Sequence, residues 1–112
     1  MIARIWGGAV RREDGDAYAD YMEATGVSGY LETPGNLGVT MLRRDVRDRC
    51  EFLMFTLWES LDSVKAFAGE DHERAVFYPE DDRFLVDRDE TSSHWEVARH
   101  VAREDEGRAP TR

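Results

Sequence analysis

Residues 52–58, with the sequence FLMFTLW, constrain the fold of this chain more than any other segment. Apolar side chains occupy both alternating positions, whereas a strand with one face in water alternates apolar with polar residues. A short buried helix would also be apolar all round, but the aromatic content, the short length and the charged turn before the segment favour a strand. Both faces of this strand should therefore be buried. Helices of so small a chain can cover one face, and a second copy of the protein is the simplest cover for the other.

The composition is that of one folded domain. The chain has 112 residues, of which 41% are hydrophobic, so one modest core is expected. A net charge of −9 argues against nucleic acid or an anionic membrane surface as partner, because a phosphate backbone requires a basic surface. The sequence shows neither a membrane span nor a secretory signal. With Cys50 as the single cysteine, no internal disulfide forms, and a cytoplasmic location is expected.

Hydrophobic periodicity and terminator residues predict the remaining elements. Strands are expected at residues 2–10, 36–44, 52–58 and 92–101. A helix should begin near residue 14 or 16 and end at Gly26, with a further helical turn over residues 27–31 as an option. A second helix should begin after the N-cap Ser60 and end at Gly69, followed by a helical piece over residues 71–78. An acidic connection over residues 80–89 should bury Phe84, Leu85 and Val86.

The resulting order is strand, helix, strand, strand, helix, strand. It is typical of an α+β, ferredoxin-like split βαβ fold (βαββαβ), an antiparallel sheet with both helices on one face. Because residues 52–58 indicate that the other face is also covered, we expect a homodimeric α/β barrel. The domain should comprise residues 1–101, and residues 102–112 should form a flexible polar tail.

The polar residues match no catalytic or metal-binding motif. His72, His94 and His100 lack metal-ligand spacing, and the sequence predicts no metal site. His94 either faces a cavity or caps the edge of the core. The aromatic side chains are more informative, because three Trp and four Tyr carry polar groups that need partners when buried. They indicate either close packing or a cavity between helices and sheet for a flat, partly polar organic ligand.

Several stretches resemble the antibiotic biosynthesis monooxygenase family of dimeric α/β barrels. They are MIARIW at the start, TPGN before the second strand, and FTLWES followed by LDSVKAFAGED, HERAVFYPEDDRFL and VDRDETSSHWEV. The resemblance extends over residues 1–97 and is specific for the fold and not for a reaction. Members include cofactor-independent oxygenases of polycyclic phenols and anthrones, haem-degrading oxygenases and small proteins of no assigned activity.

For the phenol-oxidising members, the resemblance implies that the deprotonated substrate itself reduces dioxygen, so no cofactor is needed. The protein would supply a base, hydrogen-bond donors and a dry cavity. The expected catalytic residues are His94 as base and Tyr78 as hydroxyl donor, with Tyr21 as the alternative donor. The expected substrate-binding residues are Trp58, Tyr21, Phe67, Phe77, Trp6 and His72. A purely structural role explains Trp58 equally well.

The haem-degrading members resemble this chain less at the site. Their site combines an Asn in the first strand, a Trp in the second main helix and a His just beyond it. The matching positions here are Gly7, Phe67 and Phe77. The axial histidine is therefore missing unless His72 substitutes for it.

The leading hypothesis is a cofactor-independent monooxygenase-like protein that oxidises an electron-rich aromatic substrate, an anthrone or hydroquinone of polyketide type, with dioxygen. The alternative is a non-oxidative ligand-binding or cyclase-type accessory protein of the same fold. A third hypothesis is a stress-related small dimer without catalysis. An aromatic cavity lined by His94 would favour the first two, and a filled interior would favour the third.

Overall fold

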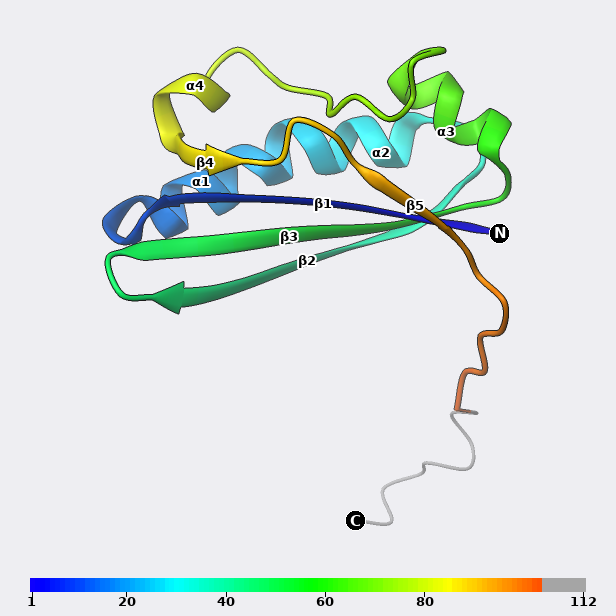
Figure 1. Cartoon of the computed structure of the whole chain (residues 1–112), viewed down its shortest axis with the longest axis horizontal. Helices are drawn as coiled ribbons and strands as arrows, with labels where there is room; N and C mark the ends of the chain where they lie inside the picture. Colours follow the sequence, from blue (N-terminus) through cyan, green and yellow to red (C-terminus); the bar gives the residue numbers. More distant parts are fainter. Residues whose placement is uncertain (104–112) are drawn as a thin grey trace.

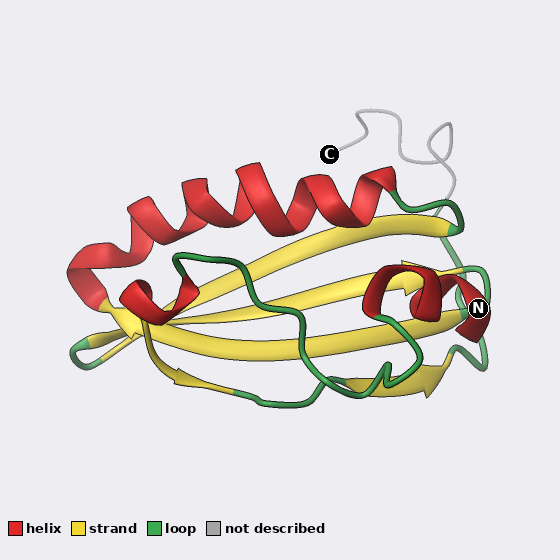
Figure 2. Cartoon of the chain, turned by 90° about the horizontal axis from the view of Figure 1, so that it is seen from above, coloured by secondary structure: helices red, strands yellow, loops and turns green. Residues whose placement is uncertain are grey.

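A single antiparallel sheet with all helices on one face forms the framework of the protein (Figures 1 and 2). The computed structural model describes residues 1–103. The central strand β1 (Ile2–Arg11) pairs along its whole length with β3 (Arg49–Trp58), and β2 (Asn36–Val46) pairs with the far edge of β3. On its other edge, β1 pairs with β4 (Leu85–Arg88) at one end and with β5 (Ser93–Glu96) at the other. The predicted ferredoxin-like fold is confirmed, but residues 85–88, expected within an acidic connection, form the additional short strand β4.

The first helical region runs continuously from α1 (Gly15–Met22) through a π-helical turn, η2 (Glu23–Val27), into α2 (Ser28–Glu32). A short 3₁₀ turn, η1 (Arg12–Asp14), precedes it. The prediction that Gly26 ends this helix is wrong. Gly26 lacks the positive φ of a helix terminator and is buried among helical neighbours. The single extra residue of a π-turn keeps the helix unbroken there.

The second predicted helix has the expected ends. The hydroxyl of Ser60 accepts a hydrogen bond from the amide of Ser63 and so caps α3 (Leu61–Ala68). Gly69, with φ of 91°, ends this helix in a conformation that favours glycine.

Residues 69–80, here named the covering segment, form no helix, and the helix predicted at 71–78 is wrong. The backbone groups of this segment are bound by distant parts of the chain. The amide of Ala75 donates to the carbonyl of Glu90, and the amide of Ser92 donates to the carbonyl of Glu73. The segment therefore crosses the helix side of the sheet as an extended strap (Figure 2). It ends at the short helix α4 (Asp81–Phe84).

The C-terminal part also departs from the prediction. The last strand ends at Glu96 and not at residue 101, because its partner β1 begins at residue 2 and the final backbone bond joins the amide of Val97 to the carbonyl of Met1. Val86, expected to be buried, is 45% exposed. The flexibility predicted for residues 102–112 concerns a tail that, from residue 104 on, lies outside the described residues.

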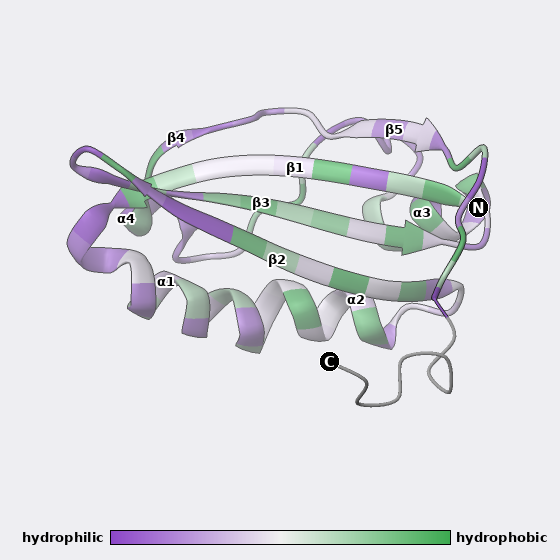
Figure 3. Cartoon of the chain, turned by 90° about the horizontal axis from the view of Figure 1, so that it is seen from below, coloured by the Kyte–Doolittle hydropathy of each residue, from purple (hydrophilic) through white to green (hydrophobic). Residues whose placement is uncertain are grey.

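The two faces of the sheet differ in cover. In β3 the even-numbered residues face the helices and are buried, and Arg4, Trp6 and Val10 of β1 are buried on the same side. Odd-numbered residues face away from the helices and form the open face, the side from which Figure 3 views the sheet. Its apolar side chains are Ile5, Leu42, Leu53, Phe55, Leu57 and Trp95. Leu53 is 40% exposed in the single chain. The expectation that both faces of residues 52–58 are buried holds for the helix face, and the other face still lacks a cover.

Candidate functional site

A buried arginine lies at the centre of the space between sheet and helices. Arg4 occupies an inward position of β1 and is only 2% exposed. Its Nε donates a hydrogen bond of 3.2 Å to Nε2 of His94, which lies opposite it on β5. Its Nη2 donates to the backbone carbonyls of Arg74 at 3.0 Å and His72 at 3.4 Å. Arg4 thus connects the central strand, the last strand and the covering segment.

Aromatic rings surround this guanidinium. The ring of Phe67 lies 5.6 Å from Cζ of Arg4, within the range of a cation–π contact. Phe67 also packs against Tyr30, with ring centroids 4.7 Å apart, and against Trp58 at 5.6 Å. The rings of His72 and His94 meet edge to face at 5.0 Å. A charged group is therefore held within an almost entirely aromatic environment.

Asp81 fixes the end of the covering segment. This carboxylate is 3% exposed and accepts hydrogen bonds from the hydroxyl of Tyr18, at 2.9 Å, and from the amide of Tyr78, at 2.6 Å. Further along the segment, Phe77 packs edge-on against Trp6. These contacts hold the segment over the sheet.

The cavity beneath the covering segment is small. Residues of β1, the first helical region and the covering segment line it, namely Arg4, Trp6, Tyr18, Met22, Gly26, Tyr30, Val76, Tyr78 and Asp81. Its volume of about 10 Å³ is close to what a single water molecule needs. This space is too small for the flat organic ligand that the aromatic composition suggested as one of two options, and His94 does not line it. A larger ligand requires the covering segment to move.

Burial changes the proton affinities of the groups around Arg4. Loss of hydration lowers the pKa of His94, and the adjacent positive charge of Arg4 lowers it further, so this imidazole is neutral at pH 7. Nε2 of the neutral ring accepts the hydrogen bond from Nε of Arg4 and therefore carries no hydrogen. The ring hydrogen is on Nδ1. Burial also raises the pKa of Tyr30 to about 12 and raises the pKa of Tyr78, so both hydroxyls stay protonated and can donate.

The structure gathers part of the predicted site around Arg4. His94, His72 and Phe67 contact each other or Arg4 directly, and Tyr78 lines the same cavity. Tyr21 lies elsewhere, because its hydroxyl accepts the amide of Glu80 and its ring packs on Tyr18 and Phe84.

The aromatic residues predicted to line the site differ in burial and in the contacts that they already make within the protein. Trp58 is fully buried, and its indole N–H donates to the hydroxyl of Thr56. Both observations agree with a purely structural role for this residue. Trp6 donates its indole N–H to the carbonyl of Asp89, yet still lines the cavity. Phe77 is half-buried and packs on Trp6.

Sequence reasoning missed Arg4 and Tyr30. A signal for Arg4 was available, since it stands between Ile2 and Trp6 on the same side of an otherwise apolar strand. Tyr30 gave no such signal, because its position depends on the unbroken passage of the helix through Gly26.

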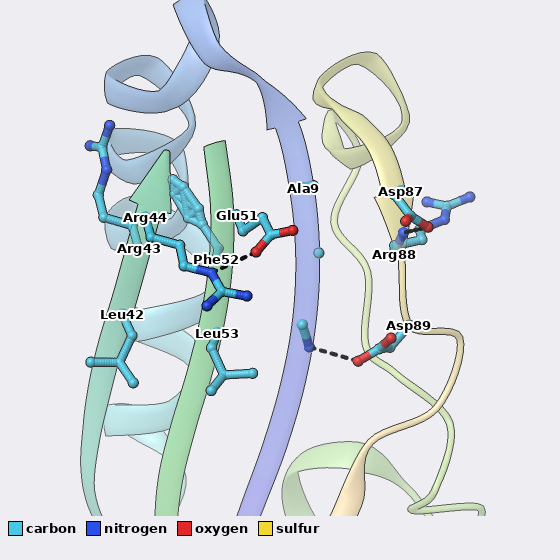
Figure 4. A pocket seen from close by; sticks show the side chains of 12 residues that line it. Ala9, Leu42, Arg43, Arg44, Glu51, Phe52, Leu53, Asp87, Arg88 and Asp89 are labelled. Carbon is cyan, nitrogen blue, oxygen red and sulfur yellow. Dashed lines mark hydrogen bonds and ion pairs between the residues drawn. The ribbon is translucent and has the colours of Figure 1, made fainter. Parts of the chain in front are cut away.

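A second hollow, of about 440 Å³, lies on the open face of the sheet (Figure 4). Leu42 and Leu53 form its apolar part, and Gly7 keeps the surface of β1 low between them and Asp89. Arg44 and Glu51, joined by an ion pair of 2.7 Å, lie at its border. Of the predicted site residues, none lines this hollow.

Two further features concern metals and membranes. Within residues 1–103 there is no group of three or more His, Cys, Asp or Glu side chains placed to hold a metal ion. In the same range, no helix has the length and apolar character needed to cross a membrane.

Several solved structures share the fold of this chain. A provisionally named antibiotic biosynthesis monooxygenase from Bacillus cereus matches with a TM-score of 0.65 and 14% identity, over 91% of this chain and 97% of that one. Another from Nitrosomonas europaea has a TM-score of 0.64 and 14% identity, over 88% of this chain and 100% of that one. The haem-degrader MhuD from Mycobacterium tuberculosis, with two haems in its active site, has a TM-score of 0.57 and 19% identity, over 91% and 100%. At these identities the matches establish a shared ferredoxin-like fold.

The family model called antibiotic biosynthesis monooxygenase matches residues 2–77. The chain belongs to this family, as the sequence resemblance implied. The match is shorter than the resemblance over residues 1–97, and it contains Arg4 and Phe67 but not Tyr78 or His94. The comparison with curated proteins gives no match.

Proposed function

We propose that this protein is a cofactor-independent monooxygenase-like enzyme that oxidises an electron-rich aromatic substrate, an anthrone or hydroquinone of polyketide type, with dioxygen. The observation that carries the proposal is a neutral imidazole, His94, held against a buried cation, Arg4, and edge to face with the ring of His72. Membership of the antibiotic biosynthesis monooxygenase family supports the reaction class. The aromatic rings near Arg4, namely Phe67 with Tyr30 and Trp58 packed on it, support an aromatic substrate.

The proposed first step is removal of a proton from the substrate by His94. In the closed protein, Nε2 of His94 accepts the Nε hydrogen of Arg4 and has no free lone pair. Entry of the substrate must therefore open this bond, after which Nε2 takes the substrate proton. A base within hydrogen-bond reach contributes about 10²–10⁴-fold to such a rate. The hydroxyl of Tyr78 is the proposed donor to the oxygen on which negative charge develops.

The subsequent oxidation needs only dioxygen and the deprotonated substrate. For an anthrone, one oxygen atom becomes the new ketone of the anthraquinone and the other leaves as water, so the electrons balance without another reductant. The protein would hold the aromatic plane and exclude water. We assign the walls to Trp6, Trp58, Phe67 and Phe77, with His72 nearer the edge of the site, whereas Tyr21 packs on Tyr18 and Phe84 and takes no part.

A second candidate is a non-oxidative ligand-binding or cyclase-type accessory protein. It needs the family fold but no dioxygen, yet a cavity of about 10 Å³ provides no standing site for its ligand either. The same observation favours the third hypothesis, a small dimer without catalysis. Oxidation of a substrate that displaces the covering segment separates the enzyme from both.

Haem does not fit the residues present. At the positions that match the site of haem-degrading members, this chain has Gly7, Phe67 and Phe77. His94 has its Nε2 engaged by a guanidinium, whose positive charge opposes a metal ion. The ring of His72 packs on that of His94 and is not free in a cavity. We therefore derive no step through haem.

The proposed assembly is a homodimer in which two open faces pack together. Leu42 is 49% exposed and Trp95 is 60% exposed on this face, and the apolar row on β3 separates them. A continuous exposed apolar patch of this kind marks an interaction surface. A cytoplasmic location remains part of the proposal, since the free buried thiol of Cys50 suits a reducing compartment.

The test is dioxygen uptake by the purified protein with a panel of anthrones and hydroquinones, in buffer free of metal and flavin. We expect uptake above the uncatalysed rate and, with ¹⁸O₂, one labelled oxygen atom in the quinone product. His94→Ala should reduce the rate by about 10²-fold or more, whereas His100→Ala, at an exposed position beyond the sheet, should not change it. The acid side of the pH–rate profile should have its midpoint below pH 6.5, because burial and the charge of Arg4 lower the pKa of His94 from 6.5. Absence of uptake with every compound would refute the proposal, and an unchanged rate for His94→Ala would refute the assignment of the base.

A further inference from the structure

Arg4 is a buried cation without a carboxylate partner. Eight ion pairs join side chains within residues 1–103, and none of them includes Arg4. Its hydrogen-bond acceptors are one neutral imidazole and two backbone carbonyls. The exposed arginines of the chain provide the contrast, since Arg44, Arg49 and Arg88 each bind a carboxylate in water.

Such a group is costly for the fold alone. Burial removes the hydration of the guanidinium, and neutral acceptors replace only part of it. An apolar side chain of similar volume would stabilise the same position at least as well. The incomplete compensation points to a negative charge that arrives with a ligand.

Three hydrogen-bond donors around the cavity are free to meet that charge. Nη1 of Arg4 and the hydroxyls of Tyr30 and Tyr78 make no hydrogen bond within the described residues, and all three side chains line the same cavity. Tyr30 as a residue is buried, with 7% of its surface exposed, and its hydroxyl is one of the free donors. Gly29 has no side chain where the Tyr78 hydroxyl approaches, since a Cβ there would lie 2.7 Å from that oxygen.

The carboxylate of Asp81 also lines the cavity, and it is already satisfied. The hydroxyl of Tyr18 and the amide of Tyr78 both donate to it. It therefore holds the covering segment in place and forms no ion pair with Arg4 within the described residues, although its negative charge acts on the hydroxyls of Tyr30 and Tyr78.

We propose that Arg4, Tyr30 and Tyr78 form a binding site for the oxyanion of an aromatic ligand, either a phenolate or an aromatic carboxylate. The aromatic class of the ligand rests on the function proposed above, whereas the anionic oxygen follows from Arg4 and the two hydroxyls alone. The aromatic body lies against Phe67, whose ring already faces the guanidinium. Binding replaces the carbonyls of His72 and Arg74 on Nη2 by a charged acceptor, which forms the stronger hydrogen bond.

This exchange also opens the site. The cavity of about 10 Å³ cannot hold an aromatic ring, so the ligand must displace the covering segment. The two hydrogen bonds from Arg4 to that segment are the ones that the oxyanion replaces. For a phenol, the hydrogen bond between Arg4 and His94 first opens and leaves Nε2 of His94 free. The phenol O–H bond then breaks, its proton moves to Nε2, and the phenolate oxygen binds the guanidinium. No oxidation or reduction is involved.

Equilibrium binding of coloured ligands tests the proposal without turnover. The probes are 1,8-dihydroxyanthraquinone, whose absorption changes when a phenol ionises, anthraquinone-2-carboxylate, and unsubstituted anthraquinone as the neutral control. We expect the wild type to bind at least one anionic probe about tenfold or more tightly than anthraquinone, as a charge-assisted hydrogen bond to a buried cation implies. With the dihydroxy probe, the spectrum of the phenolate should appear below the pH at which the free dye ionises.

Two sets of variants make the result specific. Arg4→Gln should reduce the preference for the anionic probe to near unity, and Arg4→Lys, which keeps the charge, should restore part of it. Arg11→Gln is the matched control, because Arg11 lies on the same strand and is exposed at its other end. If Arg4→Gln does not fold, as circular dichroism would reveal, Tyr30→Phe and Tyr78→Phe each remove one free hydroxyl, and each should weaken binding of the anion by about threefold or more.

The outcomes separate this proposal from the proposed function. Equal binding of anionic and neutral probes, no binding of any probe, or unchanged binding in both tyrosine variants would overturn the oxyanion site. An anion preference lost in Arg4→Gln, with no dioxygen uptake by the wild type, would support the site and reject the oxygenase. Equal dioxygen uptake by wild type and Arg4→Gln would support the oxygenase and reject the site.

Discussion

The hydrogen bond from Tyr18 to Asp81 offers a direct test of how the covering segment is held. Tyr18 is fully buried, and its hydroxyl donates at 2.9 Å to a carboxylate that is 3% exposed. Tyr18→Phe removes this donor and nothing else, and the amide of Tyr78 remains the single partner of the carboxylate. Because water reaches this carboxylate poorly, the lost donor is not replaced.

The expected loss of stability follows from the charge of the acceptor. Hydrogen bonds to charged groups contribute about 1.5–3 kcal/mol, and a value near ~2 kcal/mol corresponds to a decrease of about 1 M in the urea midpoint for a slope of about 2 kcal/mol per M. Tyr21→Phe is the matched control. The Tyr21 hydroxyl accepts a hydrogen bond from the exposed backbone amide of Glu80, and water can take the place of the hydroxyl as acceptor. Its loss should therefore lower the free energy of unfolding by less than about 0.5 kcal/mol.

Urea unfolding followed by tryptophan fluorescence measures both variants at one protein concentration. The double variant with Asp81→Asn completes a thermodynamic cycle, whose coupling energy should be about 1 kcal/mol or more. The reasoning fails if Tyr18→Phe costs no more than Tyr21→Phe, or if the coupling energy is zero. Hydrogen exchange adds a local measure, since the Tyr78 amide should exchange faster in Tyr18→Phe.

Three other predictions concern the helix, the open face and the buried phenols. Gly29→Ala places a methyl group 2.7 Å from the hydroxyl of Tyr78 and should speed amide hydrogen exchange in the covering segment. In the control Gly26→Ala, the added methyl group meets only atoms at 3.8 Å or more, and exchange in that segment should stay unchanged. Leu53→Asp should convert the proposed dimer to monomer in sedimentation velocity, and Leu31→Asp, at a 62% exposed position on α2, should not; a monomeric wild type would contradict the proposal. Burial raises the pKa of Tyr30 from 10.0 to about 12, so its stabilising contribution is complete below pH 10 and is lost as the pH rises toward 12. Thermal unfolding between pH 9 and 12 should show this loss, and Tyr30→Phe should show less of it.

The sequence by itself determined the order of the elements. Largely apolar segments at residues 2–10 and 52–58 fix where two of the strands form, because the composition and period of a strand are local properties. The ends of the second helix are equally local, since the Ser60 side chain caps it and Gly69 adopts the positive φ that ends it. The family resemblance, which depends on the same residues, is confirmed over residues 2–77.

The tertiary structure decided everything that depends on partners distant in sequence. Residues 71–78 read as a helix, yet distant groups take their backbone hydrogen bonds, and a local pattern does not contain those partners. The passage of the helix through Gly26 likewise brings Tyr30 into the cavity. The candidate site shows the same division. His94 and Tyr78 were predicted from residue type and family resemblance. The role of Arg4 depends on the tertiary structure, because strand pairing places His94 opposite it and no carboxylate of the described residues forms an ion pair with its guanidinium.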